Sequence, residues 1–590
     1  MSRGFCCLWM EAILPRKEAQ GMKAEYVDVL VIGSGAGGLA TAVAASHRHL
    51  KVAVVEKEPV FGGTTARSGG WMWIPGNAPG KRAGVQDSAE KARIYLKHET
   101  GAYFDPDRVE AFLEAGPKAV AFFEANTALQ FDLGPKFADY HPDAPGGMDG
   151  GRSIVARPFD GRRLGPEIKR LRPPLREITV LGMMIGSGKE LLHFFNVTRS
   201  PVSAFYVGKL FLRFLWDMTF HGRPMRLVNG NALIARLAKS AFDKNVPIHT
   251  SSPVKRLLTD ETGAVVGAQV LRPTGPVDIY AAKGVVLAAG GFPQDIIRRK
   301  ELLPHAPTGY EHVSPAPPGN TGDGLRLGED VGAGLDLSLP NAAALVPISR
   351  PMMADGLLGT FPHFVDRSKP GVIAITRSGR RFTNEANSYH DFCQAMIKRN
   401  REESGPDGEI AAWFVADHRA FRKYGLGFAK PAPMPYKKLI KQGYLRQGQT
   451  IAALAAQIGC DAQALETTFS RFNASARRGE DPEFGKGSTS YNRSLGDPDH
   501  QPNPCVAPLE TAPFYAVRLF VGDLGTFDGL KTNEFAQVMD KTQKPIKGLY
   551  AVGNDAASIM GGNYPGGGIT LGPALTFGYI AARHMAGGND

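Results

Sequence analysis

A glycine-rich turn between two apolar runs is the feature that most constrains this chain of 590 residues. Residues 29–32 (Val-Leu-Val-Ile) are typical of a buried strand, and they run directly into Gly33-Ser-Gly35-Ala-Gly-Gly38 and a helical pattern. The first glycine allows the sharp bend, the second lets a pyrophosphate approach the backbone, and the third lets the helix pack against its strand. The start of the helix would offer free N–H groups to the phosphates. The stretch therefore predicts a doubly wound α/β sheet that binds a dinucleotide.

Two further strand ends agree with this prediction. Residues 52–55 form a second apolar run that ends in Glu56, 18 residues after Gly38. A carboxylate in this place is typical of the group that binds the ribose hydroxyls of an adenosine. Residues 285–289 form another apolar run, which ends in Gly290-Gly291. We expect these glycines to bring a second stretch of backbone to the dinucleotide.

The composition bounds the remaining possibilities. At 43% apolar and 21% charged residues, the chain is typical of a globular protein with two or three domains. The formal net charge of +12 is spread along the chain, so we predict no nucleic-acid binding. The five cysteines show no metal-ligand spacing, so we predict no metal site and a reducing, cytoplasmic location. We expect residues 1–23 to be a disordered extension.

A helical pattern between residues 189 and 220 has two interpretations. One face carries apolar side chains, while Lys209, Arg213 and Asp217 recur on the other. The apolar face comprises Phe205, Val207, Leu210, Phe211, Phe214, Leu215 and Met218. This face either packs against the protein itself or rests on a membrane near the entrance for a lipophilic substrate. The location would then be cytoplasmic and membrane-associated.

Several motifs together give the chain a family resemblance. They are the first glycine turn, Phe61-Gly-Gly-Thr64, Ala288-Ala-Gly-Gly291, Arg380-Arg-Phe-Thr-Asn-Glu385 and Gly548-Leu-Tyr-Ala-Val-Gly-Asn554. The set resembles the fumarate reductase and succinate dehydrogenase flavoproteins. Two more specific motifs, Glu385-Ala-Asn-Ser-Tyr-His-Asp-Phe392 and Tyr564-Pro-Gly-Gly-Gly568, make it most similar to the 3-ketosteroid Δ1-dehydrogenases.

The resemblance implies an architecture and a cofactor. A Rossmann-like FAD-binding domain, with a parallel sheet and helices on both faces, would be built from residues 24–305 and 510–590. An α+β catalytic domain would span 306–509, and 175–226 would be a helical insertion. The loop 61–70 has no histidine to attach a flavin, so FAD would be held non-covalently. The expected FAD-binding residues are Gly33, Gly35, Ala36, Gly37, Gly38, Glu56, Lys57, Gly62, Gly63, Thr64, Thr65, Ser68, Gly69, Gly70, Val254, Ala289, Gly290, Gly553, Asn554, Gly568, Leu571 and Gly572.

The resemblance also implies catalytic roles. Tyr564 and the N–H of Gly568 would stabilise the negative charge that develops on the carbonyl oxygen of a ketone. Tyr389 would take the α proton, with help from Tyr140 or the adjacent His141. FAD would accept the hydride from the β carbon, so that a cyclic ketone, most simply a 3-ketosteroid, is desaturated. A lipophilic ketone substrate and an external electron acceptor, a quinone or another, are the implied partners.

Three other functions remain open from the sequence. The tyrosines recognise only the ketone, so a smaller cyclic ketone of the cyclohexanone type would serve equally well. A fumarate or enoate reductase would run the reverse reaction, but Tyr389 stands where the fumarate reductases carry an arginine. A non-catalytic FAD module is the third alternative, and the retained tyrosines disfavour it.

Overall fold

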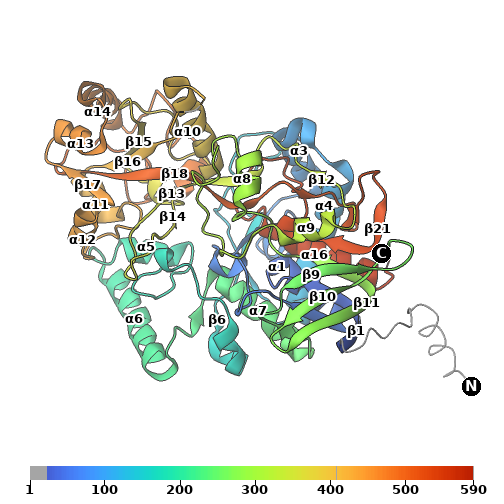
Figure 1. Cartoon of the computed structure of the whole chain (residues 1–590). Coiled ribbons are helices and arrows are strands. Elements are labelled where there is room, and N and C mark those ends of the chain that lie inside the picture. Colours follow the sequence, from blue (N-terminus) through green and yellow to red (C-terminus); the bar gives the residue numbers. More distant parts are fainter. Residues whose placement is uncertain (1–22, 407, 589–590) are drawn as a thin grey trace, which may run out of the picture.

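A computed structural model describes residues 23–406 and 408–588, and it contains two units, each built on its own sheet (Figure 1). One unit contains both ends of the described chain, and the other is formed mainly by its middle. The predicted extension, residues 1–23, lies outside the described residues except for Lys23. That residue is the first of strand β1, so its assignment to the extension was wrong.

The first unit is organised by a sheet with the order β20-β21-β11-β1-β2-β8, which is parallel except for the edge strand β20. Strand β1 pairs in parallel with β2 and β11, and β11 pairs in parallel with β21. Strands β9 and β10 continue from β11 as an antiparallel meander. The bounds are β1 Lys23–Ile32, β2 Val52–Val55, β8 Ile248–His249, β9 Val254–Thr259, β10 Val265–Arg272, β11 Gly275–Leu287, β20 Gln537–Met539 and β21 Pro545–Ala551.

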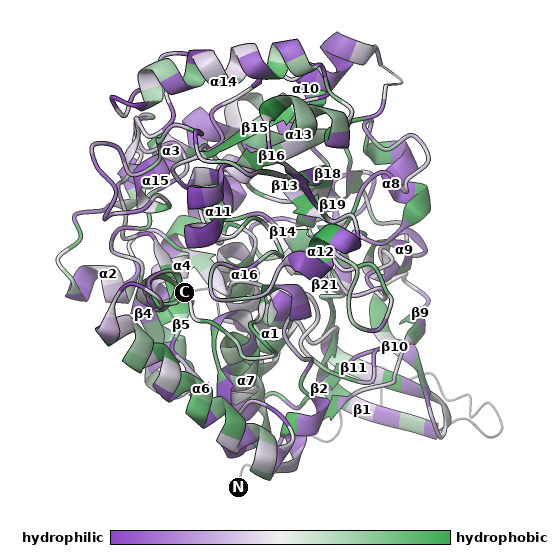
Figure 2. Cartoon of the chain, turned by 90° about the vertical axis from the view of Figure 1, so that its left-hand side faces the viewer, coloured by the Kyte–Doolittle hydropathy of each residue, from purple (hydrophilic) through white to green (hydrophobic). Residues whose placement is uncertain are grey.

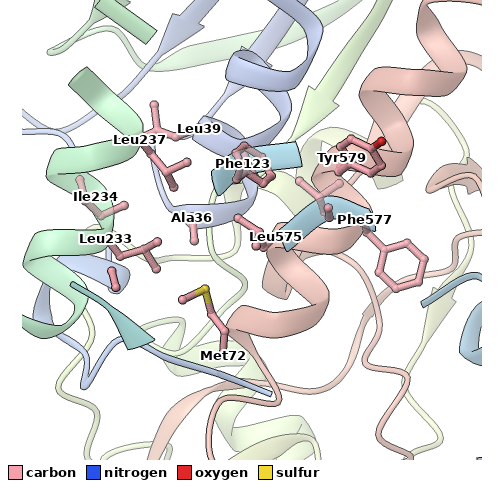
Figure 3. Packing of buried hydrophobic residues seen from close by; sticks show 14 of the residues in the cluster. Ala36, Leu39, Met72, Phe123, Leu233, Ile234, Leu237, Leu575, Phe577 and Tyr579 are labelled. Atoms are coloured by element: carbon pink, nitrogen blue, oxygen red, sulfur yellow. The ribbon is translucent and has the colours of Figure 1, made fainter. Parts of the chain in front are cut away.

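Helices cover one face of this sheet. Helix α1 (Ala36–Ser46) packs between α7 (Asn229–Asp243) and α16 (Leu571–Met585). Figure 3 shows the contact, with Leu39, Leu237 and Leu575 directed into one buried cluster. The opposite face packs against the β9–β10 meander and residues of helix α9 (Asp323–Glu329). The predicted Rossmann-like FAD-domain fold is confirmed.

The second unit contains an antiparallel sheet with the order β14-β13-β18-β16-β15, to which β17 is added beside β18. The long strand β18 pairs with β13, β16 and β17 and so lies in the middle of this sheet. Residues 514–526, predicted to belong to the FAD-binding unit, are therefore part of the other one. The bounds are β13 Ala343–Ser349, β14 Phe361–Pro362, β15 Val372–Thr376, β16 Ala412–Ala416, β17 Leu445–Gly448 and β18 Phe514–Thr526.

Shorter elements complete the two units. The other helices are α2 Ala78–Arg82, α3 Ala89–Thr100, α4 Pro106–Asn126, α8 Ile296–Leu302, α10 Tyr389–Ser404, α11 His418–Tyr424, α12 Lys437–Lys441, α13 Ile451–Ile458, α14 Ala462–Ala476 and α15 Ser490–Ser494. The other strands are β3 Trp71–Trp73, β4 Phe131–Leu133, β5 Ser153–Ala156, β6 Phe159–Asp160, β7 Arg226–Leu227, β12 Leu335–Asp336 and β19 Gly529–Leu530.

The predicted insertion forms two helices, α5 (Lys189–Phe195) and α6 (Pro201–His221), which lie at the lower left of Figure 1. The faces of α6 differ from the prediction. Asp217, placed on the solvent face, is buried and accepts the N–H of Met225 at 2.9 Å. Phe205, expected either to pack against the protein or to rest on a membrane, is 78% exposed and so does not pack inward. No helix in the described residues is long and apolar enough to span a membrane.

A buried ion-pair network fixes the second unit around Arg381. Its guanidinium donates to both oxygens of Glu385, each at 2.8 Å, and to both oxygens of Asp481 at 2.8 and 2.9 Å. All three side chains are almost fully inaccessible to water. Glu385 also accepts the N–H of Ala374 in β15 at 3.0 Å. The network therefore joins the Arg-Phe-Thr-Asn-Glu motif to the sheet.

We expect Arg381→Met to destabilise the protein by ~3–5 kcal/mol, because buried Asp481 would lose its counter-charge and buried Glu385 would keep only Lys486, at 3.6 Å. The shift in the urea midpoint of the far-UV circular dichroism signal measures the effect. Arg477→Met is the matched control, since Arg477 pairs with Glu510 on an exposed surface and its loss should cost ~0–1 kcal/mol. Equal shifts in the two variants would show that the Arg381 network does not stabilise the fold.

Candidate active site

One cavity of about 1640 Å³ extends along residues of both units. Its lining begins at the glycine turn after β1 and continues to the second unit and to α5 and α6. Single small-molecule pockets commonly have ~300–1,000 Å³. This cavity therefore has room for a dinucleotide and a second molecule beside it.

The glycine turn lies at one end of the cavity. Gly33 has a φ of +108°, and a Cβ there would come within 2.1 Å of the carbonyl oxygen of Ala288. A Cβ on Gly38 would come equally close to the oxygen of Gly33. Only glycine permits both approaches, so the turn brings the start of α1 against the end of β1 and beside β11.

Glu56 lines the cavity at the end of β2, as predicted. One of its oxygens already accepts the hydroxyl of Ser34 at 2.5 Å, and the other accepts the N–H of Glu58 at 3.0 Å. A carboxylate oxygen has two acceptor positions, so the second oxygen retains capacity for a ribose hydroxyl. Glu56 therefore also holds the glycine turn in shape, which the sequence did not indicate.

Most of the residues predicted to bind FAD line this cavity. They are Gly33, Gly35, Ala36, Gly37, Glu56, Lys57, Gly63, Thr64, Thr65, Ser68, Gly69, Gly70, Val254, Ala289, Gly290, Gly553, Asn554, Gly568 and Leu571. Gly38, Gly62 and Gly572 do not. They lie behind the lining, where Gly62 donates its N–H to Ser34 and Gly572 donates its N–H to Gly568.

Asp555 holds the last part of the chain against this end of the cavity. Its carboxylate is fully buried and accepts the N–H groups of Ala289 and Gly291 at 2.5 and 2.8 Å. A Cβ on Gly324, in α9, would come within 2.1 Å of an oxygen of Asp555. Burial raises the pKa of this carboxyl group to about 6. Asp555 thus joins segments from three distant parts of the sequence.

A cluster of tyrosines forms another part of the lining. The hydroxyl oxygens of Tyr140 and Tyr389 lie 2.9 Å apart, in hydrogen-bond contact. The ring of Tyr564 stacks on Tyr140 at 5.3 Å and meets Tyr389 edge-on at 4.9 Å. Tyr491 packs against Tyr140 at 4.5 Å. The three tyrosines predicted from separate motifs are therefore brought together.

Burial makes these phenols weaker acids than usual. It raises the pKa of Tyr389, Tyr140 and Tyr564 well above the ordinary value near 10. The guanidinium of Arg367 opposes this effect on Tyr140 and lies 5.7 Å from the centre of the Tyr389 ring. Arg367 also donates to the hydroxyl of Tyr491 at 2.9 Å. It supplies a buried positive charge directly beside the phenols.

Local structure fixes each tyrosine. Tyr389 is the first residue of α10, whose N-terminus is capped by the Ser388 side chain. Tyr140 donates its N–H to the carbonyl of Pro565, next to Tyr564, at 2.9 Å. The preceding Asp139 is buried and accepts from Trp73 and Arg152. The loop of Tyr140 is therefore tied directly to the motif that carries Tyr564.

Gly568 lies close to the same place. Its φ is +104°, and a Cβ would come within 2.4 Å of the backbone of Trp71. Its N–H donates to no protein acceptor in residues 23–406 and 408–588. This N–H is thus available to a ligand in the cavity, which Gly568 also lines.

His141 does not contact the tyrosine hydroxyls, although it follows Tyr140. Its two ring nitrogens lie 2.7 Å from carboxylate oxygens of Glu99 and Asp391. Burial alone would lower the pKa of His141, but these two carboxylates raise it to about 10. A charged imidazole with both nitrogens engaged cannot relay the proton of Tyr389, so the structure favours Tyr140 over His141 for this task.

Sequence reasoning missed several residues that line the cavity or adjoin the tyrosines. They are Arg367, Lys369, Lys430 and Tyr491. None of them lies in a motif that would have indicated a site. Their places follow from contacts between segments that are distant in the sequence.

Comparisons with known proteins agree with this geometry. The family model described as an FAD binding domain matches residues 28–571. A 4-oxocyclohex-2-ene-1-carboxylate 5-dehydrogenase of Sinomonas cyclohexanicum is 43% identical, over 95% of this chain and 93% of that protein. A 3-oxosteroid 1-dehydrogenase of Mycobacterium tuberculosis is 36% identical, over 96% of this chain and 99% of that protein.

A solved structure is similar over the same length. The 3-ketosteroid Δ1-dehydrogenase of Sterolibacterium denitrificans, in complex with 1,4-androstadiene-3,17-dione, is 36% identical and superposes with a TM-score of 0.87. The match covers 95% of this chain and all of that one. The predicted resemblance is confirmed: this chain belongs to the FAD binding domain family and is an FAD-dependent oxidoreductase similar to the 3-ketosteroid Δ1-dehydrogenases.

Proposed function

We propose that the chain desaturates a cyclic ketone beside its carbonyl group, with a 3-ketosteroid as the substrate. The observation that carries this proposal is the contact between the hydroxyls of Tyr140 and Tyr389, beside the ring of Tyr564. Ketone desaturation needs a group that takes the α proton and donors that stabilise the carbonyl oxygen. The cluster contains candidates for both tasks in one buried place.

The carbonyl oxygen binds between Tyr564 and Gly568. The phenol O–H of Tyr564 and the unengaged N–H of Gly568 act as donors to it. Because burial raises the pKa of Tyr564, this phenol stays protonated and remains a donor. Both donors stabilise the charge that the oxygen gains as the α proton leaves.

Tyr389 takes the α proton. Its raised pKa leaves few molecules in the phenolate form near neutral pH, but it makes that phenolate a strong base. The hydroxyl of Tyr140 contacts that of Tyr389, and the guanidinium of Arg367 lies over the Tyr389 ring, so both groups stand beside the phenolate when it forms. FAD, when bound, supplies the acceptor for the hydride of the β carbon, and the double bond forms between the two carbons.

The residues at the glycine end fit FAD. The cradle after β1 is closed to any side chain at Gly33 and Gly38 but leaves backbone groups facing the cavity. The described lining contains neither histidine nor cysteine, the side chains most suited to attaching a flavin covalently. We therefore propose that FAD is held non-covalently and is reoxidised by an external acceptor.

Two substrate sizes are consistent with the relatives. The names of two relatives indicate a 3-oxosteroid and an oxocyclohexene carboxylate. The cavity volume accommodates either one beside FAD. The alternative of a fumarate-type reductase is disfavoured, because a tyrosine stands at 389 where the fumarate reductases carry an arginine.

The apolar outer stripe of α6 supports a peripheral contact with a membrane. The stripe comprises Val202, Phe205, Leu212, Trp216 and Phe220, which lie on one side of the helix and are 60–78% exposed. Lys209, four residues after Phe205, lies within it and Arg213 lies beside it, and Figure 2 shows green segments along α6 at the lower left. The opposite side of the helix lines the cavity through Val207 and Phe211. A lipophilic ketone could thus pass from the membrane to the cavity along this helix.

We expect Glu56→Ala to weaken FAD binding by ~1.5–3 kcal/mol, because the ribose hydroxyls lose a charge-assisted hydrogen bond. Titration of the apoprotein with FAD measures the dissociation constant, after acid precipitation has released the native flavin into the supernatant. Ser34→Ala is the comparison variant, since it removes the side-chain contact between Glu56 and the turn, together with the acceptor for the N–H of Gly62, and leaves the Glu56 carboxylate in place. An equal loss in both variants would mean that Glu56 acts through the turn alone, and flavin in the acid pellet would disprove non-covalent binding.

We expect Tyr389→Phe to slow solvent exchange of the ketone's α hydrogen by ~10²–10⁴, because the base is lost while the ring remains. Tyr564→Phe should slow flavin reduction by ~10²–10³ and also weaken ketone binding, since one donor to the carbonyl oxygen is lost. Exchange is read by mass spectrometry and flavin reduction by anaerobic stopped-flow absorbance with a 3-ketosteroid.

The pH dependence gives a second measurement on the same variants. Since the pKa of Tyr389 lies above 10, its phenolate fraction should rise about tenfold per pH unit between pH 7 and 9. Wild-type exchange should rise in parallel, and this rise should disappear in Tyr389→Phe. If Tyr389→Phe exchanges the α hydrogen at the same rate as the wild type, Tyr389 is not the base.

We expect the combined change of Phe205, Leu212 and Trp216 to serine to abolish sedimentation with vesicles of phosphatidylcholine and phosphatidylglycerol. These side chains are exposed, so their loss should leave the fold and the activity on a dissolved ketone unchanged. Leu271→Ser, an exposed leucine of β10, is the control. Unchanged sedimentation of the triple variant would rule out α6 as the membrane contact.

A further inference from the structure

Two lysines line the cavity without a carboxylate partner. Lys369 follows a short turn of helix and is buried, while Lys430 follows α11 and is half-buried. In residues 23–406 and 408–588, no carboxylate oxygen lies within ion-pair distance, 4 Å, of either ammonium group. A buried cation without an anion is costly, so the two side chains require an explanation.

The protein satisfies these ammonium groups only in part. Lys369 donates to the carbonyls of Leu495 and Gly496 at 2.8 and 2.7 Å, and Lys430 donates to the carbonyl of Glu177 at 3.0 Å. An ammonium group has three N–H donors. One N–H of Lys369 and two of Lys430 are therefore left for another acceptor.

Aromatic rings surround both ammonium groups. Lys369 lies 4.9 Å from the ring centre of Phe195 and 5.8 Å from that of Tyr424. Lys430 lies 4.8 Å from Phe361 and 5.4 Å from Phe428. Such ring faces hold a cation in place and exclude water from it. An anion that reached this place would find two positioned cations at low dielectric.

The nearby carboxylates are engaged elsewhere. Asp366 contacts His363 at 2.6 Å and accepts the N–H of Gly427 at 2.9 Å. Glu177 accepts the N–H of Thr360 at 2.8 Å. Burial lowers the pKa of Lys369 and of Lys430 to about 8, although Asp366 opposes this shift in both. Both groups remain largely charged at neutral pH.

Asp497, the remaining carboxylate near Lys369, is paired with Lys423 and with the hydroxyl of Tyr424. Lys423 and Arg367 add two more positive charges near Lys369 and the tyrosines. Four positive groups, Lys369, Lys430, Lys423 and Arg367, thus stand against the three carboxylates Asp366, Asp497 and Glu177. Lys369 and Lys430 line the cavity, together with Asp366.

The two lysines and the tyrosine cluster line the same cavity. Lys369 lies two residues after Arg367, whose guanidinium lies over the ring of Tyr389. The carbonyls that hold Lys369 belong to the segment that follows Tyr491, and Tyr491 packs against Tyr140. A ketone whose carbonyl group binds at Tyr564 can therefore direct its opposite end towards the two lysines.

We propose that Lys369 and Lys430 form a carboxylate-binding subsite, so that the preferred substrate is a cyclic ketone with a carboxylate remote from its carbonyl group. This inference rests on the proposed ketone desaturation, because it assigns the far end of the same substrate. The carboxylate accepts the unengaged N–H groups of both lysines. A monocyclic oxo-acid and a 3-ketosteroid with an acidic side chain both present this chemistry.

The test compares each acid with its neutral methyl ester. The holoenzyme is mixed anaerobically with 4-oxocyclohexanecarboxylate or its ester, and with a 3-ketosteroid carboxylic acid or its ester, and flavin bleaching is followed. We expect kcat/KM to favour the acid at least tenfold in one of the two pairs, mainly through KM. The pair that shows the preference identifies the substrate size.

Lysine variants assign the preference to the subsite. Lys369→Met and Lys430→Met should each reduce the ratio of kcat/KM for the acid to kcat/KM for the ester about tenfold, and Lys369→Arg should restore that ratio. Lys438→Met, on the exposed face of α12, is the control and should keep it. Equal rates for acid and ester in the wild type, or a preference that survives both changes to methionine, would overturn the proposal.

Binding of cyclohexanecarboxylate separates this proposal from the ketone chemistry. This acid has no ketone, so calorimetry measures its dissociation constant without turnover. Tenfold weaker binding in Lys369→Met and Lys430→Met would support the subsite even if no ketone reduced the flavin. If the ketones bleach the flavin while the two lysine variants bind this acid as the wild type does, the subsite fails and the desaturation stands.

Discussion

The structure depends on the parallel pairing of β1, β11 and β21, three strands that are distant in the sequence. Because they run in the same direction, their carboxyl ends meet at one edge of the sheet, where open α/β sheets bind ligands. The glycine turn, the segment 288–291 and the segment 552–555 follow these ends directly. The buried carboxylate of Asp555 then fixes the last two segments to each other. Without this pairing, the end of the cavity that is lined by the glycine turn would not form.

The same cavity receives its reactive groups from both units. Tyr389 begins a helix of the second unit, whereas Tyr564 and Tyr140 belong to segments that pack on the first. Burying phenols together raises the pKa of each, which would disable them as bases in isolation. Arg367 offsets part of this cost at Tyr140. In the proposed mechanism the same burial keeps Tyr564 protonated as a donor, and Tyr389 acts through the small fraction that is phenolate.

The sequence predicted those parts of the site that depend on local patterns. The turn after β1 could be recognised because strand, glycines and helix follow each other within a dozen residues. Tyr389 and Tyr564 could be assigned because each lies in a short motif with a family likeness, whereas the loop of Tyr140 matches the family less well. The central place of β18 could not be predicted, since its partners lie at 343–349 and 412–448 and pairing over such distances leaves no periodic signal.

The outward face of α6 was misassigned because this helix is apolar on both sides, so periodicity alone could not choose between them. Lys369 could not be predicted, because its contacts Phe195 and Gly496 lie more than 100 residues before and after it in the sequence.

The place of Tyr564 near the end of the chain has a consequence for synthesis on the ribosome. Chains emerge from the amino terminus, and early segments fold before later ones exist. Strand β21, Asp555, Tyr564 and Gly568 all lie within the last 46 residues of the sequence. A nascent chain therefore cannot assemble the cavity, however well its earlier strands have paired. The cavity is therefore complete only once residues 545–568 have been made, and a chain that is cut before them should accumulate as a colourless protein.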